Sequence, residues 1–427
     1  MAKILCISDV MDDVDLFTKE HELFLFKIKQ WPPSEHSFNR FQELYNILCK
    51  QIDLSSIDLI FAEYVESLPL LYFIRKNGFF CPAIMVPHTN PYPLNILFYF
   101  ILISTLSHPN DVILCGSENA KVAYEKIVSI SAENICTFGI KSLFKPMNKQ
   151  RCREELNLCL DKRYVLYTGR IMNDKGLTEL VEAIDLIRQK IKDVVLIISA
   201  THIDHYYYNN IATKLLNSIL FYRIDKNTLT KLYNAVDLYA SCATSIFETY
   251  GKSQLEAIAC NTPVIVPSWD GFPYYISKNH GAIAKVNYVE HPINNPFQYA
   301  RVDINDFATK CCKLLTMKKN PSTKLPEWAL YDNTVQTITK LINNILQNEV
   351  KKYLEFPNDK PPISLNKLSS SVIRCLKHYN INCLSELIIR SEEKGLISRK
   401  DPGEPEILKL LHNDIFCTMD KVKTKII

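Results

Sequence analysis

Short apolar runs alternate with helix-patterned segments along most of this chain, and that alternation limits the fold more than any other feature. In the first third of the chain the apolar runs lie at Lys3–Val10, Leu23–Ile28, Leu59–Tyr64, Ala83–Pro87 and Val112–Cys115. Segments with apolar residues at helical spacing, Phe38–Gln51 and Ser67–Lys76, lie between some of them. Strands separated by helices predict a parallel sheet with helices on both faces.

The same alternation restarts after a polar connector near Lys145–Arg153. Further strand-like runs follow at Tyr164–Thr168, Val194–Ser199, Ser218–Ile224, Leu238–Ser241 and Pro263–Pro267, with a helical pattern over Gly176–Lys190. Two doubly wound units can bind a ligand at the carboxyl ends of their strands. We therefore predict an α/β fold with Rossmann-like domains over residues 1–150 and 151–330 facing a cleft, and closing helices over residues 331–354.

Length and composition agree with such a fold. A chain of 427 residues is too long for one ordinary core, so two or three domains are expected. Its 47% hydrophobic and 22% charged residues are typical of a soluble globular protein. The net charge of +4 is small for this length and does not indicate a nucleic-acid-binding protein.

The chain holds 14 cysteines without paired C-x-x-C spacing, and Met1-Ala2-Lys3 runs directly into a strand-like segment. We therefore expect reduced thiols and a cytoplasmic protein. The longest apolar run, Leu94–Leu106, is too short to span a bilayer. A buried helix is the favoured interpretation, and a helix lying on the inner membrane surface (residues 94–106) stays an alternative.

The segment from Glu248 to Glu256 combines two carboxylates with the start of a helix. Gly251 follows the first glutamate, and the helix-favouring run Ser253–Cys260 comes next. A helix N-terminus offers N–H groups and a positive dipole end, so it can hold a phosphate. One carboxylate could then bind sugar hydroxyls and the other a ribose. From this stretch alone, a plain helix cap is an equal alternative.

A second polar segment, Tyr167–Gly176, follows the first strand of the second unit. Arg170 and Lys175 would lie on a strand-to-helix loop and point into the cleft. Two cations there can neutralise a diphosphate and the charge that develops as it leaves. In isolation, two solvated surface charges are the alternative interpretation.

These segments, taken in order, resemble a known enzyme family. The resemblance rests on Gly169-Arg170, Lys175-Gly176, Glu248, Gly251, Glu256-Ala257 and Thr262-Pro263-Val264. They are similar to the motifs of the retaining glycosyltransferases of family four (glycosyl transferases group 1), which have the GT-B architecture. The resemblance covers roughly residues 1–350 and is strongest over 160–285.

For the second domain, the resemblance implies a nucleotide-sugar donor site. Glu248 would hold hydroxyls of the donor sugar, and Glu256 would bind the nucleotide ribose. Backbone amides near Gly251, Lys252 and Ser253 would meet the phosphates. The diphosphate would be bound by Arg170, next to Gly169, and by Lys175.

For the first domain, the resemblance implies the acceptor side. His88, in Val86-Pro-His-Thr-Asn90, matches a histidine near the reacting sugar, although a lone histidine after a strand is more often structural. The reaction implied is transfer of a hexosyl unit with retention, without a metal or other cofactor. UDP-hexose is the family's default donor, with GDP-mannose next, and the acceptor stays open.

The sequence departs from the family at three places. The turn Ser8–Asp13 after the first strand has no glycine, and Asn261 stands where a glycine is usual. A later glycine-proline-glutamate pattern becomes Asp270-Gly-Phe-Pro-Tyr274, without the glutamate. These changes bear on the acceptor and the donor base more than on the donor diphosphate.

Residues 363–427 follow a polar hinge, Glu355–Pro362, and predict a small all-α module. It resembles the helix-hairpin-helix-like C-terminal domain of the bacterial RNA polymerase alpha subunit. Ser371, Arg374 and Glu404 occupy positions where the relative uses an arginine, an asparagine and a lysine on DNA. Phosphate contacts need cations, so rather than nucleic-acid binding we expect a docking module for a protein partner, or an element that packs against the catalytic unit. A non-catalytic scaffold and a DNA-linked regulator are the alternatives to an enzyme.

Overall fold

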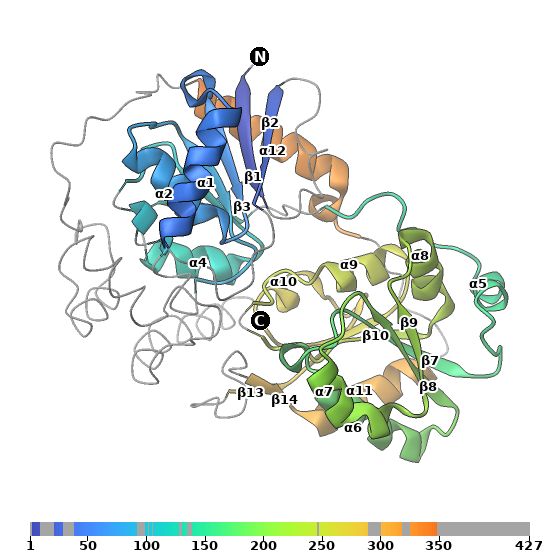
Figure 1. Ribbon diagram of the computed structural model, residues 1–427. Helices are drawn as coiled ribbons and strands as arrows, with labels where there is room; N and C mark the ends of the chain where they lie inside the picture. Colours follow the sequence, from blue (N-terminus) through green and yellow to red (C-terminus); the bar gives the residue numbers. More distant parts are fainter. Residues whose placement is uncertain are drawn as a thin grey trace. The chain divides into compact units, whose positions relative to one another are not determined.

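The computed structural model describes residues 2–8, 21–28, 38–91, 99–100, 102–104, 106–127, 130–134, 139–245, 247–288, 300–317 and 325–347. The chain divides into two compact units (Figure 1). The first unit comprises Met1–Thr137 together with the residues from Thr334 on, and the second comprises Phe138–Asn333. The chain therefore leaves the first unit once and returns to it through its last described helix.

The first unit is built on a parallel sheet. Its described strands are β1 (Lys3–Ser8), β2 (Glu22–Lys27), β3 (Leu59–Glu63), β4 (Ala83–Val86), β5 (Val112–Cys115) and β6 (Ser131–Asn134), in the order β2-β1-β3-β4-β5-β6. The central strands β3, β4 and β5 are buried along their whole length. This explains their continuous apolar sequences, because helices cover both faces of such a sheet.

The helices of the first unit include α1 (Phe38–Gln51), α2 (Ser67–Lys76), α4 (Glu118–Ile127) and most of α12 (Tyr331–Leu346), with a 3-10 turn at Leu54–Ser56. A buried ion pair fixes α2 to the start of β5. The Arg75 guanidinium donates to both carboxylate oxygens of Asp111, at 2.6 and 2.7 Å, and neither side chain is exposed. Asp111 also accepts the N–H groups of Ala83 and His108, so its buried charge is well compensated.

The second unit has a parallel sheet of its own. Its described strands are β7 (Arg163–Thr168), β8 (Val194–Ala200), β9 (Ser218–Tyr222), β10 (Leu238–Ala240), β11 (Val264–Pro267) and β12 (Gly281–Ala284), in the order β12-β11-β10-β7-β8-β9. After β12, the strands β13 (Val286–Tyr288) and β14 (Ala300–Val302) form a separate short antiparallel pair. Because β7, β10 and β11 are neighbours, the loops that follow them share one edge.

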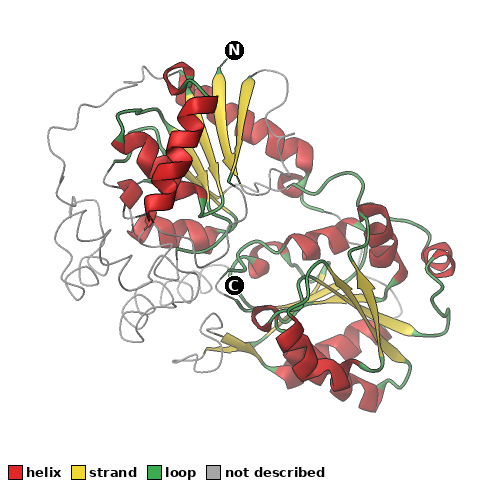
Figure 2. Ribbon diagram, viewed as in Figure 1, coloured by secondary structure: helices red, strands yellow, loops and turns green. Residues whose placement is uncertain are grey.

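Helices cover both faces of this second sheet (Figure 2). They are α5 (Lys149–Glu155), α6 (Leu177–Lys190), α7 (His205–Ile211), α8 (Lys226–Ala235), α9 (Lys252–Ala259), α10 (Phe272–Tyr275) and α11 (Ile304–Thr316), with 3-10 turns at Asn173–Lys175, Ala212–Leu215 and Glu327–Ala329. Helix α6 buries Leu177, Leu180, Ile184 and Ile187 at helical spacing and packs against α11 and β8. Asp225 caps α8 through the N–H groups of residues 227 and 228.

The sequence predicted most of these elements. The helices Phe38–Gln51 and Ser67–Lys76 are confirmed with the same bounds, and every predicted strand is present within a few residues. The structure adds β6, β12 and α11, which the prediction missed. The predicted connector Lys145–Arg153 contains the start of α5, which Asn148 caps.

Several predictions fall wholly or partly outside the described residues. The helical module at 363–427 and all but Ser8 of the turn Ser8–Asp13 lie outside them. Within the apolar run 94–106, the described residues Tyr99, Phe100, Leu102 and Ile103 are helical and buried, as the buried-helix interpretation predicted. None of the helices that the structure describes is long and apolar enough to cross a membrane.

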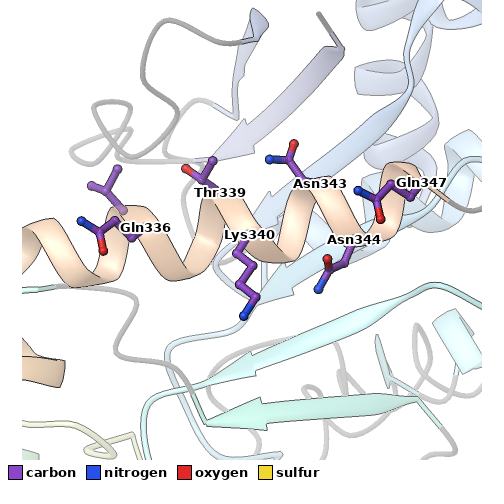
Figure 3. Close-up of a pocket in the computed structure, with 7 residues that line it drawn as sticks. Gln336, Thr339, Lys340, Asn343, Asn344 and Gln347 are labelled. Carbon is purple, nitrogen blue, oxygen red and sulfur yellow. The ribbon is translucent and has the colours of Figure 1, made fainter.

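Helix α12 carries a polar hollow on one face (Figure 3). It is lined by Val335, Gln336, Thr339, Lys340, Asn343, Asn344 and Gln347. Amide and hydroxyl groups dominate this lining, and none of the residues predicted to bind the donor belongs to it. The hollow therefore gives no support for a catalytic site on α12.

Candidate active site

The candidate site of the second unit lies at the carboxyl ends of three neighbouring strands. The loops that follow β7, β10 and β11 begin at Gly169, Ser241 and Ser268. Strand β10 pairs with β7 on one side and with β11 on the other, all parallel. Ligands of open α/β sheets bind at this edge, so the sheet brings together loops that are far apart in the sequence.

Gly176 sets how closely two of these loops approach each other. Its backbone is left-handed, with φ 66°, and it begins α6. A Cβ atom at this position would overlap the carbonyl group of Cys242, in the loop after β10. Only glycine fits both constraints. The close approach places Lys175 beside the loop that carries Glu248.

Lys175 and Glu248 form a direct ion pair. The Nζ of Lys175 lies 2.7 Å from Oε2 of Glu248, and the two side chains are 16% and 20% exposed. The N–H of Glu248 donates to the carbonyl of Ser245, which fixes the loop behind the carboxylate. Each charge is thus compensated and remains partly exposed to solvent. An anionic ligand could therefore replace Glu248 as the ion-pair partner of Lys175.

Arg170 lies on the same loop but is more open. Its side chain is 46% exposed, and its guanidinium is 3.8 Å from the buried carboxylate of Asp174. Its own carbonyl accepts the Tyr167 hydroxyl, while the N–H of Gly169 donates to Ser199 on the neighbouring strand. The backbone around Arg170 is therefore fixed, and its charged end is available to a ligand.

Helix α9 begins at this edge without a side-chain cap. Its N-cap residue is Gly251, with φ 71° and no side-chain hydrogen bond. A Cβ atom here would lie 2.5 Å from the Phe272 ring, so the turn needs glycine. Lys252 and Ser253 form the first turn, where helix N–H groups and the dipole favour an anion.

Glu256 is half-buried further along α9. The hydroxyl of Tyr233 donates to its Oε2 at 2.9 Å, and Tyr233 also lies 3.1 Å from the hydroxyl of Thr168. Burial raises the pKa of Glu256 from 4.5 to about 6, against the opposing effects of the Tyr233 hydrogen bond and of Lys252 and Lys226. Near neutral pH this group is an ionised acceptor.

The first unit has a polar cluster at the carboxyl ends of β1, β3 and β4. His88 Nε2 lies 3.2 Å from Oε1 of Glu63, and the Ser8 hydroxyl donates to Oε2 of Glu63 at 2.6 Å. Tyr64 and His88 both have left-handed backbones, and their ring centroids are 4.5 Å apart. Such backbone strain is typical of functional sites.

The structure groups the predicted residues by unit. Gly169, Arg170, Lys175, Glu248, Gly251, Lys252, Ser253 and Glu256 all belong to the second unit, on or next to its carboxyl edge, and His88 belongs to the first. Sequence reasoning missed the partners that hold them, Tyr233, Thr168, Glu63 and Ser8. Ser8, Glu63 and Thr168 are each the last residue of a strand, and that position is the signal from which the sequence could have indicated them.

The described residues form no candidate metal-binding cluster. Among those residues, no group of three or more histidine, cysteine, aspartate or glutamate side chains could hold a metal ion. The charges available at the edge of the second unit are Arg170, Lys175 and the N-terminus of α9. The fold, two parallel-sheet Rossmann-like units, is consistent with the GT-B architecture, and these groups lie at the edge of the second sheet where open α/β sheets bind ligands.

Comparison with known proteins points to a family. Residues 148–293 match the model of the family described as Glycosyl transferases group 1. A curated relative is an uncharacterized glycosyltransferase, MJ1607, from Methanocaldococcus jannaschii. It is 28% identical over 122 residues, which are 28% of this chain and 30% of the relative. The chain spans less than half the length of the curated relatives it matches.

Solved structures show the same fold over most of the chain. Sucrose-phosphate synthase from Thermosynechococcus elongatus gives a TM-score of 0.64 at 16% identity, covering 81% of this chain and all of that one. Alr3699/HepE of Anabaena in complex with UDP-glucose gives 0.61 at 15% identity, with 81% and 100% coverage. These structures show a GT-B-like fold, and the family match to Glycosyl transferases group 1 covers residues 148–293 of the second unit.

A first prediction concerns the close approach at Gly176. Gly176→Ala should lose about 1–2 kcal/mol to the left-handed backbone and about 1–3 kcal/mol more to overlap with Cys242. Gly78 is the matched control, because it also has positive φ but nothing lies within 4 Å of its Cβ position. Denaturant unfolding of both alanine variants measures the difference. Equal losses would contradict a required approach of the two loops.

A second prediction concerns the pH dependence of stability. Between pH 4.5 and about 6 the unfolded chain loses the Glu256 proton while the folded protein keeps it. The contribution of Glu256 to the unfolding free energy is therefore fully present below pH 4.5 and is lost as the pH rises through about 6. Relative to Glu256→Gln, the wild type should lose roughly 2 kcal/mol of unfolding free energy over that window. Parallel pH profiles for the two proteins would refute the raised pKa.

Proposed function

We propose that this protein is a retaining glycosyltransferase that moves a hexosyl unit from a nucleotide-diphospho-sugar, a UDP-hexose, to an acceptor, without a metal. The observation that carries the proposal is the meeting of Lys175, Glu248 and the uncapped N-terminus of α9 at one strand edge. The group offers a cation and backbone N–H groups for a diphosphate, and a carboxylate for sugar hydroxyls.

The donor would be held along this edge from one end to the other. The ribose hydroxyls would donate to Glu256, and the diphosphate would lie against the first turn of α9, at Lys252 and Ser253. Arg170 and Lys175 would bind the phosphate oxygens from the opposite loop. Glu248, released from Lys175, would accept hydroxyls of the hexose. The UDP-glucose complex of the Anabaena neighbour supports UDP-glucose as the first donor to test.

Chemistry at the anomeric carbon would follow from this arrangement. The bond between that carbon and the phosphate oxygen breaks, and negative charge grows on the leaving diphosphate. Arg170, Lys175 and the α9 N-terminus would lie where this charge develops, which would lower the barrier. The acceptor oxygen forms the new bond on the same face, and its proton passes to an oxygen of the departing diphosphate. His88 would be the first unit's contribution near the reacting sugar.

The proposal predicts that Lys175→Ala and Glu248→Ala abolish transfer while the protein stays folded. Each substitution removes a group that would contact the donor, and each side chain is partly exposed, so little packing is lost. A loss of at least about a hundredfold in transfer or donor hydrolysis is expected from removing one charge-stabilising group. Product formation from UDP-glucose, followed by chromatography, is the measurement.

Lys214 and Glu182 provide the matched control. They form an exposed ion pair, 3.2 Å apart and 44% exposed at each side chain, in the same unit. Lys214→Ala and Glu182→Ala should leave transfer unchanged, because exposed pairs contribute little. Near-normal transfer by both Lys175→Ala and Glu248→Ala would refute the assignment of this site.

A further inference from the structure

Tyr233 has a polar hydroxyl in a fully buried position. The residue lies on α8 with no exposed surface, between the end of β7 and helix α9. Its hydroxyl is 2.9 Å from Oε2 of Glu256 and 3.1 Å from Oγ1 of Thr168. Burying a hydroxyl is unfavourable unless it is hydrogen-bonded, so both contacts matter for placing the phenol there.

The direction of these hydrogen bonds follows from the protons available. An ionised carboxylate only accepts, and a phenol has one proton to donate. Burial raises the pKa of Tyr233 well above 10, so the phenol keeps its proton. Tyr233 therefore donates to Glu256, and the Thr168 hydroxyl donates to Tyr233. Thr168 directly precedes Gly169 and Arg170, so this chain of hydroxyls connects the cation-bearing loop with Glu256.

A second buried phenol lies beside the first. Tyr239 on β10 is 1% exposed, and its ring centroid is 6.1 Å from that of Tyr233. Its hydroxyl interacts with the side chains of Thr168 and Ser253. Two buried hydroxyls thus contact two residues of the candidate donor site, Ser253 in the first turn of α9 and Glu256.

We infer that Tyr233 is a positioning residue for nucleotide binding: its hydroxyl fixes the Glu256 carboxylate through Oε2 and directs Oε1 toward a ribose. This inference rests on the proposed function and assigns a role to a residue that would not itself touch the donor. No described residue forms a hydrogen bond with Oε1 of Glu256, whereas Oε2 is occupied. A fixed carboxylate loses less side-chain entropy on binding than a mobile one.

Burial raises the pKa of Glu256, and the Tyr233 hydrogen bond opposes that rise, so it lowers the pH at which Glu256 becomes an acceptor. The titratable and charged groups facing Glu256 are Tyr233 and Lys226 on α8, Lys252 on α9, Tyr239 on β10 and Cys260 after α9. Among the groups that lower the pKa of Glu256, Tyr233 has the largest effect. Without its hydroxyl, the carboxyl should keep its proton to higher pH, and ribose hydroxyls would lose their acceptor.

The test is Tyr233→Phe, which removes the hydroxyl and keeps the ring. Calorimetric titration with UDP-glucose should give a Kd that improves as the pH rises through about 6 in the wild type. A sugar nucleotide suits this measurement because its esterified diphosphate does not titrate there. In Tyr233→Phe the midpoint should rise by about one pH unit, so binding should weaken about fivefold at pH 6 and about twofold at pH 7. The difference should narrow again in alkaline buffer.

Two controls separate positioning from packing. Tyr124→Phe removes another fully buried hydroxyl, which donates to the Thr89 carbonyl in the first unit. It should leave the Kd for UDP-glucose and its pH midpoint unchanged. In a Glu256→Gln background, Tyr233→Phe should no longer move any midpoint, because the titrating carboxyl is gone. Weakening of equal size at every pH would overturn the inference in favour of lost packing.

A ligand-free measurement distinguishes this inference from the proposed function. In Tyr233→Phe, the fall in unfolding free energy that starts at pH 4.5 should continue above about 6, because the folded protein keeps the Glu256 proton longer. A wild type that binds no UDP-sugar contradicts the proposed function. Normal wild-type binding with an unshifted midpoint in Tyr233→Phe overturns only the role of Tyr233.

Discussion

The candidate site depends on the parallel pairing of β7 with β10 in the middle of the second sheet. That pairing aligns the two strand ends, so the loops carrying Lys175 and Glu248 leave the sheet side by side. Gly176 then allows the loops to touch, since any larger residue would overlap Cys242. A shift of either strand by one residue would separate the lysine from the glutamate and would turn the buried side chains to the opposite face.

Most of the fold could be predicted because apolar periodicity reports burial directly. The fully buried strands β4, β5 and β11 are continuous apolar runs, and α1 and α2 have a helical period. Strand β12, Gly281–Ala284, was missed because glycine and alanine give no strand signal, and its glycine is required where a Cβ would overlap the Val264 carbonyl. Helix α11 has apolar residues at helical spacing, so the sequence was sufficient to predict it.

The sequence predicted which loops form the candidate site, but it did not predict which side chains contact each other there. Gly251 before a helix-favouring run indicates an anion-binding N-terminus, and that helix begins where expected. The pairing of Lys175 with Glu248 joins residues 73 positions apart and depends on strand order, which local patterns do not contain. Tyr233 appears in the sequence as one apolar position of a helix, and only the packing of α8 against α9 brings its hydroxyl to Glu256.

The most direct test is a crystal structure of the protein with UDP-glucose bound. The proposed function predicts the diphosphate at the first turn of α9, with Lys175 turned from Glu248 to a phosphate oxygen and the ribose at Glu256. The Lys175–Glu248 distance, 2.7 Å in the structure described above, should therefore lengthen. A nucleotide bound elsewhere, with that ion pair unchanged, would contradict the assignment of this strand edge as the donor site.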